Sequence, residues 1–174
     1  MGSCNGHSNK IDIEDAKKAT LESALKSVEV AKNQQLDLLQ KFKEVYSYFE
    51  PESYDSQDHW FLEVPEEASD LKTLTDHLKR FSVAMDQILL EESPDYYRKS
   101  CIYAKYQISQ LTEYLQQLAI LMNGNEAVDD IYPSLPVDLN TEDSPSARQT
   151  RDYLVIRDYR RLLDLIQNVL TNYE

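Results

Sequence analysis

The unequal spacing of the helix-breaking residues limits the folds open to this chain more than any other feature of its sequence. Apolar residues recur every three or four positions along long segments, which is the period of an amphipathic α-helix. The first and last connections between these segments are long, whereas the step from Glu91 to Pro94 is short. The segments that we predict to be helices are residues 11–49, 66–91, 94–122 and 144–174.

The connection lengths predict how these helices are arranged. A short link makes the second and third helices antiparallel neighbours, whereas a long link lets the chain cross back along the preceding helix. The order long, short, long therefore predicts an all-α fold, a four-helix bundle that runs up-up-down-down with two long crossover loops.

Residues with preferences at helix ends mark several boundaries. Ser144 with Pro145, and Ser93 with Pro94, each have the order of an N-cap residue followed by a first-turn proline. The acidic residues that follow Pro65 are expected to form the first turn of the second helix.

Side-chain patterns predict which parts of each helix are buried. Residues 32–35 interrupt the apolar stripe of the first helix, so we expect a kink or a less buried turn there. The plain alternative is a long helix whose first turns overhang. In the third helix, the predicted buried positions are Tyr97, Cys101, Ala104, Ile108, Leu111, Leu115, Leu118 and Met122. In the fourth, the predicted charged outer face is Arg151, Arg157, Asp158, Arg160, Arg161, Asp164 and Asn168.

Composition limits the classes of partner. Glycine occurs only 3 times, as is typical of helical proteins, and the formal net charge is −13. Such a charge disfavours nucleic acid and anionic lipid, because no basic stripe is present to bind phosphate. No apolar run reaches the ~20 residues of a membrane-spanning helix, so we expect no membrane insertion. We expect one domain, residues 11–174, preceded by a flexible tail, residues 1–10.

The polar N-terminus, MGSCNGHSNK, leaves three interpretations open. It is a remnant of cloning ahead of a mature secreted chain, a natural start without a leader, or an acylation site at Gly2 and Cys4. The acylation motif calls for Ser or Thr where this chain has Gly6.

The sequence contains no pattern that indicates catalysis or metal binding. The three histidines are scattered, there is no Glu-x-x-His pair, and there is no glycine-rich phosphate loop. We therefore predict that the protein is not an enzyme and has no cofactor or metal. Cys4 and Cys101 belong at opposite ends of the bundle, whereas bridged Cα atoms lie within ~7 Å, so we predict no disulfide.

Aromatic residues are the best candidates for a binding surface. Trp60 lies in the first long connection within the run WFL, where it either plugs the side of the core or belongs to an exposed contact patch. Tyrosine occurs 12 times, and a tyrosine-rich acidic surface suits protein recognition.

Three stretches resemble the interleukin-6 class of long-chain four-helix cytokines, and within it the ciliary neurotrophic factor, cardiotrophin-like cytokine and leukaemia inhibitory factor group. QQLDLLQKFKEVYSYFEPESYDS is similar to the end of that group's first helix and the start of its first crossover. VPEEASDLKTLTDHLKRFSVAMDQILLEES is similar to its second helix, and RDYLVIRDYRRLLDLIQNVL to its fourth.

The resemblance implies a signalling ligand, secreted or released without a leader, that acts outside the cell as a monomer and assembles class-one cytokine receptors. A shared signal-transducing receptor would contact the outer faces of the first and third helices. The residues concerned are Lys18, Glu22, Glu29, Asn33, Tyr106, Gln110, Glu113, Tyr114 and Gln117. A ligand-specific receptor would contact the first crossover, including Trp60, and the last turns of the fourth helix, at Arg157, Arg160, Arg161, Asp164 and Asn168.

One departure from the group concerns a third receptor contact. Members that bind the leukaemia inhibitory factor receptor carry Phe-x-x-Lys at the start of the fourth helix, where this chain has Ser146 and Gln149. The alternative to a cytokine is an intracellular helical-bundle adaptor or scaffold, which the polar N-terminus and the unpaired cysteines also fit.

Overall fold

The computed structural model describes residues 5–55, 64, 70–91, 94–123 and 144–174. Within these residues all regular structure is helical, and no strand occurs. The predicted all-α class is therefore confirmed. The helices are α1 (Asn5–Val45), α2 (Glu52–Asp55), α3 (Leu71–Leu90), α4 (Asp95–Asn123) and α5 (Pro145–Thr171).

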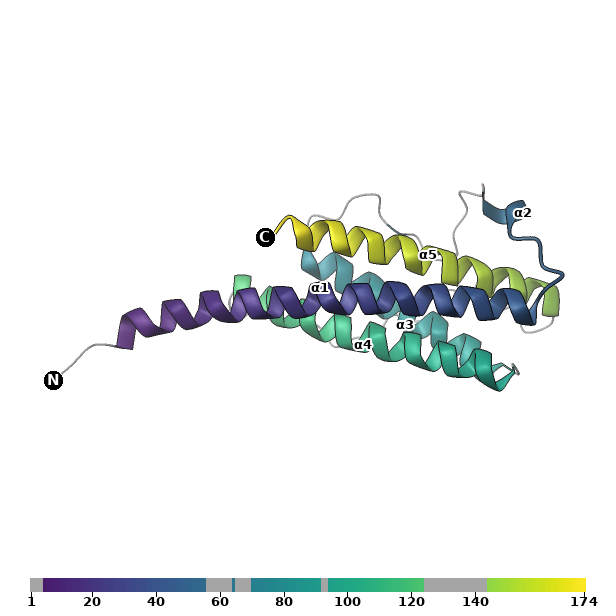
Figure 1. The fold of residues 1–174 in the computed structure, drawn as a ribbon, viewed down its shortest axis with the longest axis horizontal. Coiled ribbons are helices and arrows are strands. Elements are labelled where there is room, and N and C mark those ends of the chain that lie inside the picture. Colours follow the sequence, from purple (N-terminus) through teal and green to yellow (C-terminus); the bar gives the residue numbers. More distant parts are fainter. Residues whose placement is uncertain (1–4, 56–63, 65–69, 92–93, 124–143) are drawn as a thin grey trace.

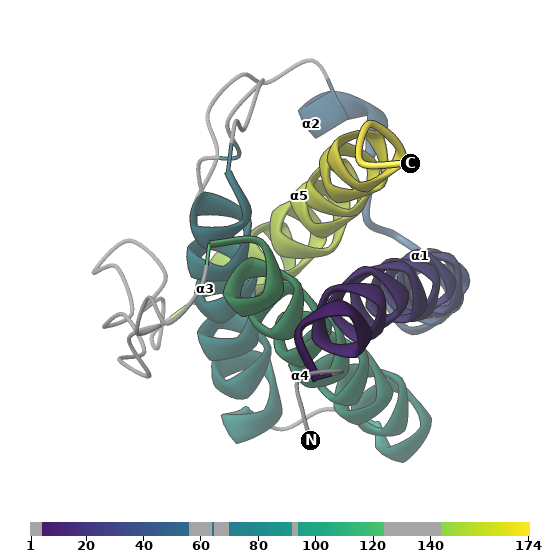
Figure 2. The same cartoon turned by 90° about the vertical axis from the view of Figure 1, so that its left-hand side faces the viewer.

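The four long helices stand at the corners of a square in cross-section (Figure 2). α1 packs mainly against α4 and α5, and α3 packs against the same two helices. Cross-helix bonds give the directions. Gln35 of α1 bonds to Ile156 of α5, whereas Lys32, earlier in α1, reaches Asp164, later in α5, so these two helices are antiparallel.

The same test orients α3 and α4. Arg98, near the start of α4, donates to the carbonyl of Leu89 at the end of α3, and Lys105 pairs with Asp86. The two helices are antiparallel neighbours, as the short link predicted. α1 and α3 thus run in one direction and α4 and α5 in the other (Figure 1). The long connections, 56–63 with 65–69 and 124–143, lie outside the described residues.

The core forms where the apolar stripes of the four long helices meet. The predicted core positions of α4 from Tyr97 to Leu118 are buried. Ile120 and Leu121 were expected beside them, but Ile120 and Met122 are 45% and 38% exposed because α4 ends at Asn123. At one end of the core, Phe42 is surrounded by aromatic rings, with centroid distances of 5.0–6.2 Å that favour edge and tilted packing. The rings are those of Tyr46, Phe49, Tyr97 and Tyr153.

Helix ends differ from prediction at three places. α1 begins at Asn5 rather than residue 11, and it ends at Val45 before a turn. The flexibility predicted for residues 1–10 stays a prediction, although residues 5–10 are helical. The N-cap of α3 is Asp70, whose carboxylate accepts from the Thr73 amide at 2.6 Å, so the predicted start at residue 66 was wrong. The N-cap role of Ser144 in α5 is confirmed, since its Oγ accepts from Ala147 N at 3.2 Å.

The polar middle of α1 was expected to be less buried, which is wrong. Gln35 is buried and donates from Nε2 to the backbone carbonyl of Ile156 at 2.9 Å. Lys32 is partly buried and forms a 2.7 Å ion pair with Asp164. These side chains therefore tie α1 to α5, and α1 remains one continuous helix whose first turns overhang.

The predicted charged face of α5 is also wrong at Arg151 and Asp158, and at Arg157, which bonds to α2. Arg151 and Asp158 are buried, at 1% and 0% exposure, and residues 151–156 are buried without interruption. A stripe-and-face pattern assumes one solvent side, whereas this part of α5 is enclosed on all sides, so its charges must pair inside the protein.

Candidate functional site

The residues predicted on α1 and α4 mostly face solvent. Lys18, Glu22, Glu29 and Asn33 of α1 are exposed, as are Tyr106, Gln110, Glu113 and Gln117 of α4. Tyr114 is the exception, because it is half-buried and packs against the core. Between the two helices, Ser100 Oγ donates to Asp37 at 3.0 Å and accepts from Gln34 at 3.1 Å, which fixes how α1 and α4 lie side by side.

Next to Glu29, one of the residues predicted on α1, a network of charged side chains joins α1 to α5. Glu29 stands one turn before Lys32, whose ammonium reaches Asp164 and Gln167 of α5. Arg160 adds to this network, since it pairs with Asp164 at 3.4 Å and donates to the Lys32 carbonyl at 3.3 Å. Arg161 and Asn168 are exposed beyond it. The α1–α5 side is therefore a charged surface that is held in place by cross-helix bonds.

Arg157 was predicted to lie on this outer face, and it does not. Its Nη1 donates to the Tyr54 carbonyl of α2 at 2.6 Å, and its Nε donates to Asp158 at 3.0 Å. Its side chain is only 11% exposed. The guanidinium therefore fastens α2 to α5. Trp60, the other candidate of the first connection, lies outside the described residues.

Sequence reasoning found Tyr96 and Tyr106 of a tyrosine stripe on α4 but missed Tyr103. We define this stripe as Tyr96, Tyr103 and Tyr106, all exposed, with Tyr103 and Tyr106 at 57% and 67%. The signal was available, because Tyr103 lies one turn before Tyr106 and seven residues after Tyr96. Exposed tyrosines combine apolar area with a hydrogen-bonding hydroxyl, a combination common in protein interfaces.

At the start of α5, an aromatic side chain from another element occupies the surface. Gln149 Nε2 donates to the hydroxyl of Tyr48 at 2.7 Å, and Tyr48 is strongly exposed after the end of α1. Ser146 is exposed beside it. Neither partner of this bond was predicted to meet the other, because they are far apart in the sequence.

A buried charged cluster lies at the same end of the bundle. Arg151 Nη1 donates to Glu91 Oε1 at 2.7 Å, Nη2 donates to Glu91 Oε2, and Nη2 also donates to Asp152 at 2.6 Å. The Tyr97 hydroxyl lies 3.5 Å from the other Asp152 oxygen. Burial raises the pKa of Asp152 to about 7, although pairing with Arg151 opposes this rise.

Two other buried groups beside this cluster have raised pKa values. Burial, reinforced by the charge of Asp152, raises the pKa of the Cys101 thiol to about 12. Burial also raises the pKa of Tyr97 well above its ordinary value. A thiol kept in its protonated form packs as a small apolar group, as was predicted for Cys101, which is a free buried cysteine. Cys4 lies outside the described residues.

The described residues form neither a cluster of metal-binding side chains nor a membrane-spanning helix. Among residues 5–55, 64, 70–91, 94–123 and 144–174, no group of three or more His, Cys, Asp or Glu side chains could hold a metal ion. In the same part of the chain, no helix is long and apolar enough to cross a bilayer.

Comparison with known proteins identifies no relative. No family model, curated protein or solved structure matches this chain. The surface itself offers three candidate binding features. They are the α4 tyrosine stripe, the charged α1–α5 side, and the Tyr48–Gln149 pair at the start of α5.

Proposed function

We propose that this protein is a helical signalling ligand that binds and assembles class-one cytokine receptors outside the cell. The proposed fold is the up-up-down-down four-helix bundle of the interleukin-6 class, with residues 50–65 and 123–143 as crossover loops. The supporting observation is the direction of the helices: α1 and α3 run one way, α4 and α5 the other, and each packs against two antiparallel neighbours. In a four-helix bundle whose links are all short, each helix runs opposite to the one before it, so the first two long helices would not run in the same direction.

The proposed contact with a shared signal-transducing receptor uses the outer faces of α1 and α4. The α4 tyrosine stripe supports this, because large aromatics that are exposed on a rigid helix resemble the residues that dominate binding energy at interfaces. Glu113 and Gln117 continue the exposed face beyond Tyr106. Lys18, Glu22 and Glu29 would add the contribution of α1.

The proposed contact with a ligand-specific receptor uses the last turns of α5. Asp164 and Arg160 are held by Lys32, so they would not need to be ordered on binding, and preorganised side chains lose less entropy. Exposed Arg161 and Asn168 flank them. Arg157 is withdrawn from this contact by its bond to Tyr54.

A third receptor contact is proposed at the start of α5. The Phe-x-x-Lys residues are replaced by Ser146 and Gln149, but Tyr48 from the end of α1 is exposed at the same place and bonded to Gln149. An aromatic supplied by α1 would serve where the related cytokines use a residue of the fourth helix.

Binding to a panel of immobilised class-one receptor ectodomains tests the proposal. We expect at least one receptor to bind. The double variant Tyr103→Ala with Tyr106→Ala should lower the affinity for the shared receptor about 30-fold, which corresponds to the ~2 kcal/mol of an interface hot spot. The matched control is Leu90→Ala, which truncates a strongly exposed residue at the end of α3, outside all the proposed receptor contacts, and should leave that receptor's affinity unchanged.

Two results would count against the proposal. If no class-one receptor bound, the receptor-ligand function would be lost, and the intracellular adaptor would become the preferred alternative. If a receptor bound but the α4 double variant behaved like the Leu90 control, the assignment of the α4 face would be wrong while the function stood.

A further inference from the structure

The N-terminal part of α1 extends past the end of the bundle. α1 starts at Asn5, and its first turns project beyond the ends of α4 and α5 (Figure 1). Ile13 lies on the same side of α1 as the buried Ala24 and Ala31, since these positions are separated by whole helical repeats. Ile13 is nevertheless 45% exposed. The core-facing stripe of α1 is therefore longer than the bundle that covers it.

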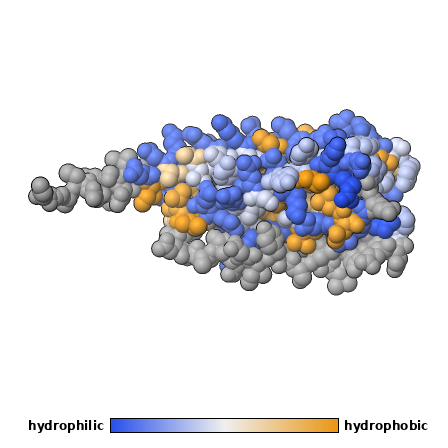
Figure 3. All heavy atoms as spheres, turned by 90° about the horizontal axis from the view of Figure 1, so that it is seen from below, coloured by the Kyte–Doolittle hydropathy of each residue, from blue (hydrophilic) through white to orange (hydrophobic). Residues whose placement is uncertain are grey.

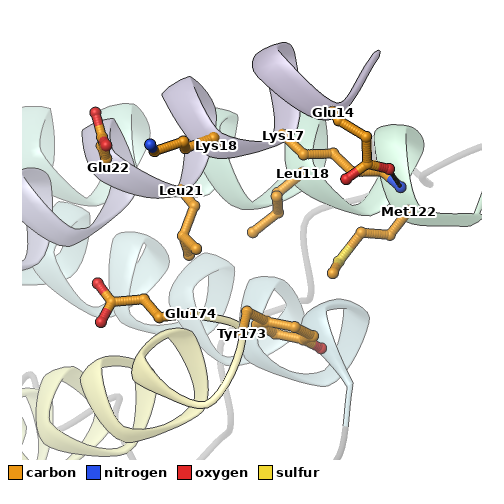
Figure 4. Close-up of a pocket in the computed structure, with 9 residues that line it drawn as sticks. All are labelled: Glu14, Lys17, Lys18, Leu21, Glu22, Leu118, Met122, Tyr173 and Glu174. Carbon is orange, nitrogen blue, oxygen red and sulfur yellow. Dashed lines mark hydrogen bonds and ion pairs between the residues drawn. The ribbon is translucent and has the colours of Figure 1, made fainter. Parts of the chain in front are cut away.

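A cavity of about 470 Å³ opens where the projecting part of α1 leaves the bundle. Its floor is apolar: Leu21, Leu118 and Met122 point toward the same space, with Tyr173 on its far side (Figure 4). Leu21 and Leu118 are buried, whereas Met122 and Tyr173 are partly exposed. Apolar residues gather visibly at this end of the molecule (Figure 3). The volume is in the range of small ligand pockets, about 300–1,000 Å³.

The rim of the cavity carries both signs of charge, with carboxylates in slight excess. The carboxylates of Glu14, Glu22 and Glu174 line it, against the ammonium groups of Lys17 and Lys18. Lys17 is already paired with Glu14 at 3.2 Å. Farther out on the projecting part of α1, Asp12 and Asp15 are exposed. An apolar floor inside a rim with an excess of carboxylates is complementary to an apolar group that carries positive charge beside it.

Charge decides between the occupants that would suit an apolar cavity. The chain has a net charge of −13, so a second copy would be repelled, and an anionic membrane surface would be repelled as well. We propose that this cavity binds a basic amphipathic segment of a partner protein. One bulky apolar side chain of the segment enters between Leu21, Leu118 and Met122. Its Lys or Arg residues meet Glu22 and Glu174, and the rest of the segment lies along the exposed Ile13 side of α1.

This proposal does not rest on the receptor-ligand function. Lys18 and Glu22 belong to both surfaces, but the α4 tyrosine stripe, which the receptor panel tests, contributes no residue to the cavity lining. A failed receptor panel would therefore leave the cavity proposal standing, and a failed cavity test would leave the panel result intact.

Two fluorescently labelled helical peptides of about 18 residues provide the probes. They share one leucine face and differ only in carrying Lys or Glu at every polar position. Fluorescence anisotropy with the full chain should show binding of the Lys peptide and about tenfold weaker binding of the Glu peptide, because like charges would then face each other. The affinity for the Lys peptide should fall as salt rises.

Variants separate a built site from general attraction to an acidic protein. The double variant Glu22→Lys with Glu174→Lys should lower the affinity for the Lys peptide about tenfold. Met122→Ser should lower it about fivefold. The matched control, Glu29→Lys with Glu44→Lys, makes the same change in net charge at exposed residues of α1 outside the cavity, and should change the affinity less than twofold. All the altered side chains are exposed, so the fold should be kept, and circular dichroism checks this.

Three outcomes would overturn the proposal. One is equal weakening by the control pair and the rim pair, which would mean attraction by net charge alone. Another is binding that Met122→Ser leaves unchanged. The third is a concentration-dependent doubling of mass that Met122→Ser abolishes, which would assign the cavity to a second copy of the chain.

Discussion

The guanidinium of Arg151 and the carboxylate of Glu91 face each other in a two-pronged ion pair that joins the start of α5 to the end of α3. Arg98 of α4 donates to the carbonyls of Leu89 and Glu91 at 2.7 and 3.1 Å, so the same corner also holds the start of α4. Three helices are therefore joined at Glu91, through its carboxylate to α5 and through its carbonyl to α4.

Removal of Arg151 should destabilise the protein strongly. Arg151→Ala leaves Asp152 buried beside Glu91 without its cation, and such a loss costs about 3–5 kcal/mol. Urea unfolding followed by circular dichroism measures the change. Arg161→Ala, which truncates an exposed arginine of the same helix, is the control and should cost less than about 1 kcal/mol. Equal losses in the two variants would contradict a role for the buried pair.

Asp158 should make the protein less stable as the pH rises. Burial raises its pKa from 3.8 to about 7, although its bond to Arg157 opposes this. Since the folded pKa lies above the unfolded one, the stabilising contribution is complete below about pH 4 and is lost as the pH rises to about 7. Asp158→Asn should therefore gain more stability relative to the parent at pH 8 than at pH 5, by at most about 3 kcal/mol. A difference that does not vary with pH would contradict the shift.

The capping carboxylate of Asp70 should act in the opposite direction with pH. Its hydrogen bond from the Thr73 amide lowers its pKa, so its contribution is present at neutral pH and is lost as the pH falls through the lowered value. Asp70→Ala should cost about 1 kcal/mol at pH 7, whereas Asp70→Asn should cost a few tenths at most, because Asn also caps well. Thermal unfolding of the two variants at pH 7 checks the order. A larger loss for Asn than for Ala would refute the capping role.

Cys101 should resist alkylation while the protein is folded. Its thiol is buried and its pKa is raised to about 12, so almost no thiolate is present at pH 8. Iodoacetamide treatment, followed by mass spectrometry of the peptide that contains Cys101, should show labelling only after urea unfolding. Rapid labelling of the native protein would show that the core around α4 opens readily.

Much of the fold follows from local sequence. The α4 stripe from Tyr97 to Leu118 and the N-cap Ser144 were predicted correctly because helical period and capping depend only on nearby residues. The short link between α3 and α4 also predicted their antiparallel packing, which the Arg98 bonds confirm. The start of α3 was missed because two kinds of N-terminal signal, Pro65 with acidic residues and Asp70, compete within a few residues.

The candidate site was less predictable. Helical geometry placed Tyr106, Gln110 and Glu113 outward correctly, since exposure on one helix follows from its own stripe. It could not foresee that Arg157 bonds to α2, or that Tyr48 meets Gln149, because both contacts join distant parts of the chain. It also could not locate the cavity beside Met122, which depends on α1 being longer than its neighbours.

The sequence by itself determined where the chain is helical and which stripe of each helix is apolar, because backbone hydrogen bonds and side-chain period are local properties. Only the tertiary structure decided which charged side chains are buried and which are exposed to solvent. Arg151 and Asp158 are polar residues that any helical pattern assigns to solvent, yet they are buried because α5 is enclosed by its neighbours. Asp158 pairs with its sequence neighbour Arg157, whereas Arg151 pairs both with its neighbour Asp152 and with Glu91, which the fold brings to it from the end of α3. Burial of a charge is stable only with a partner, and packing decides which charges are buried and which distant groups join them.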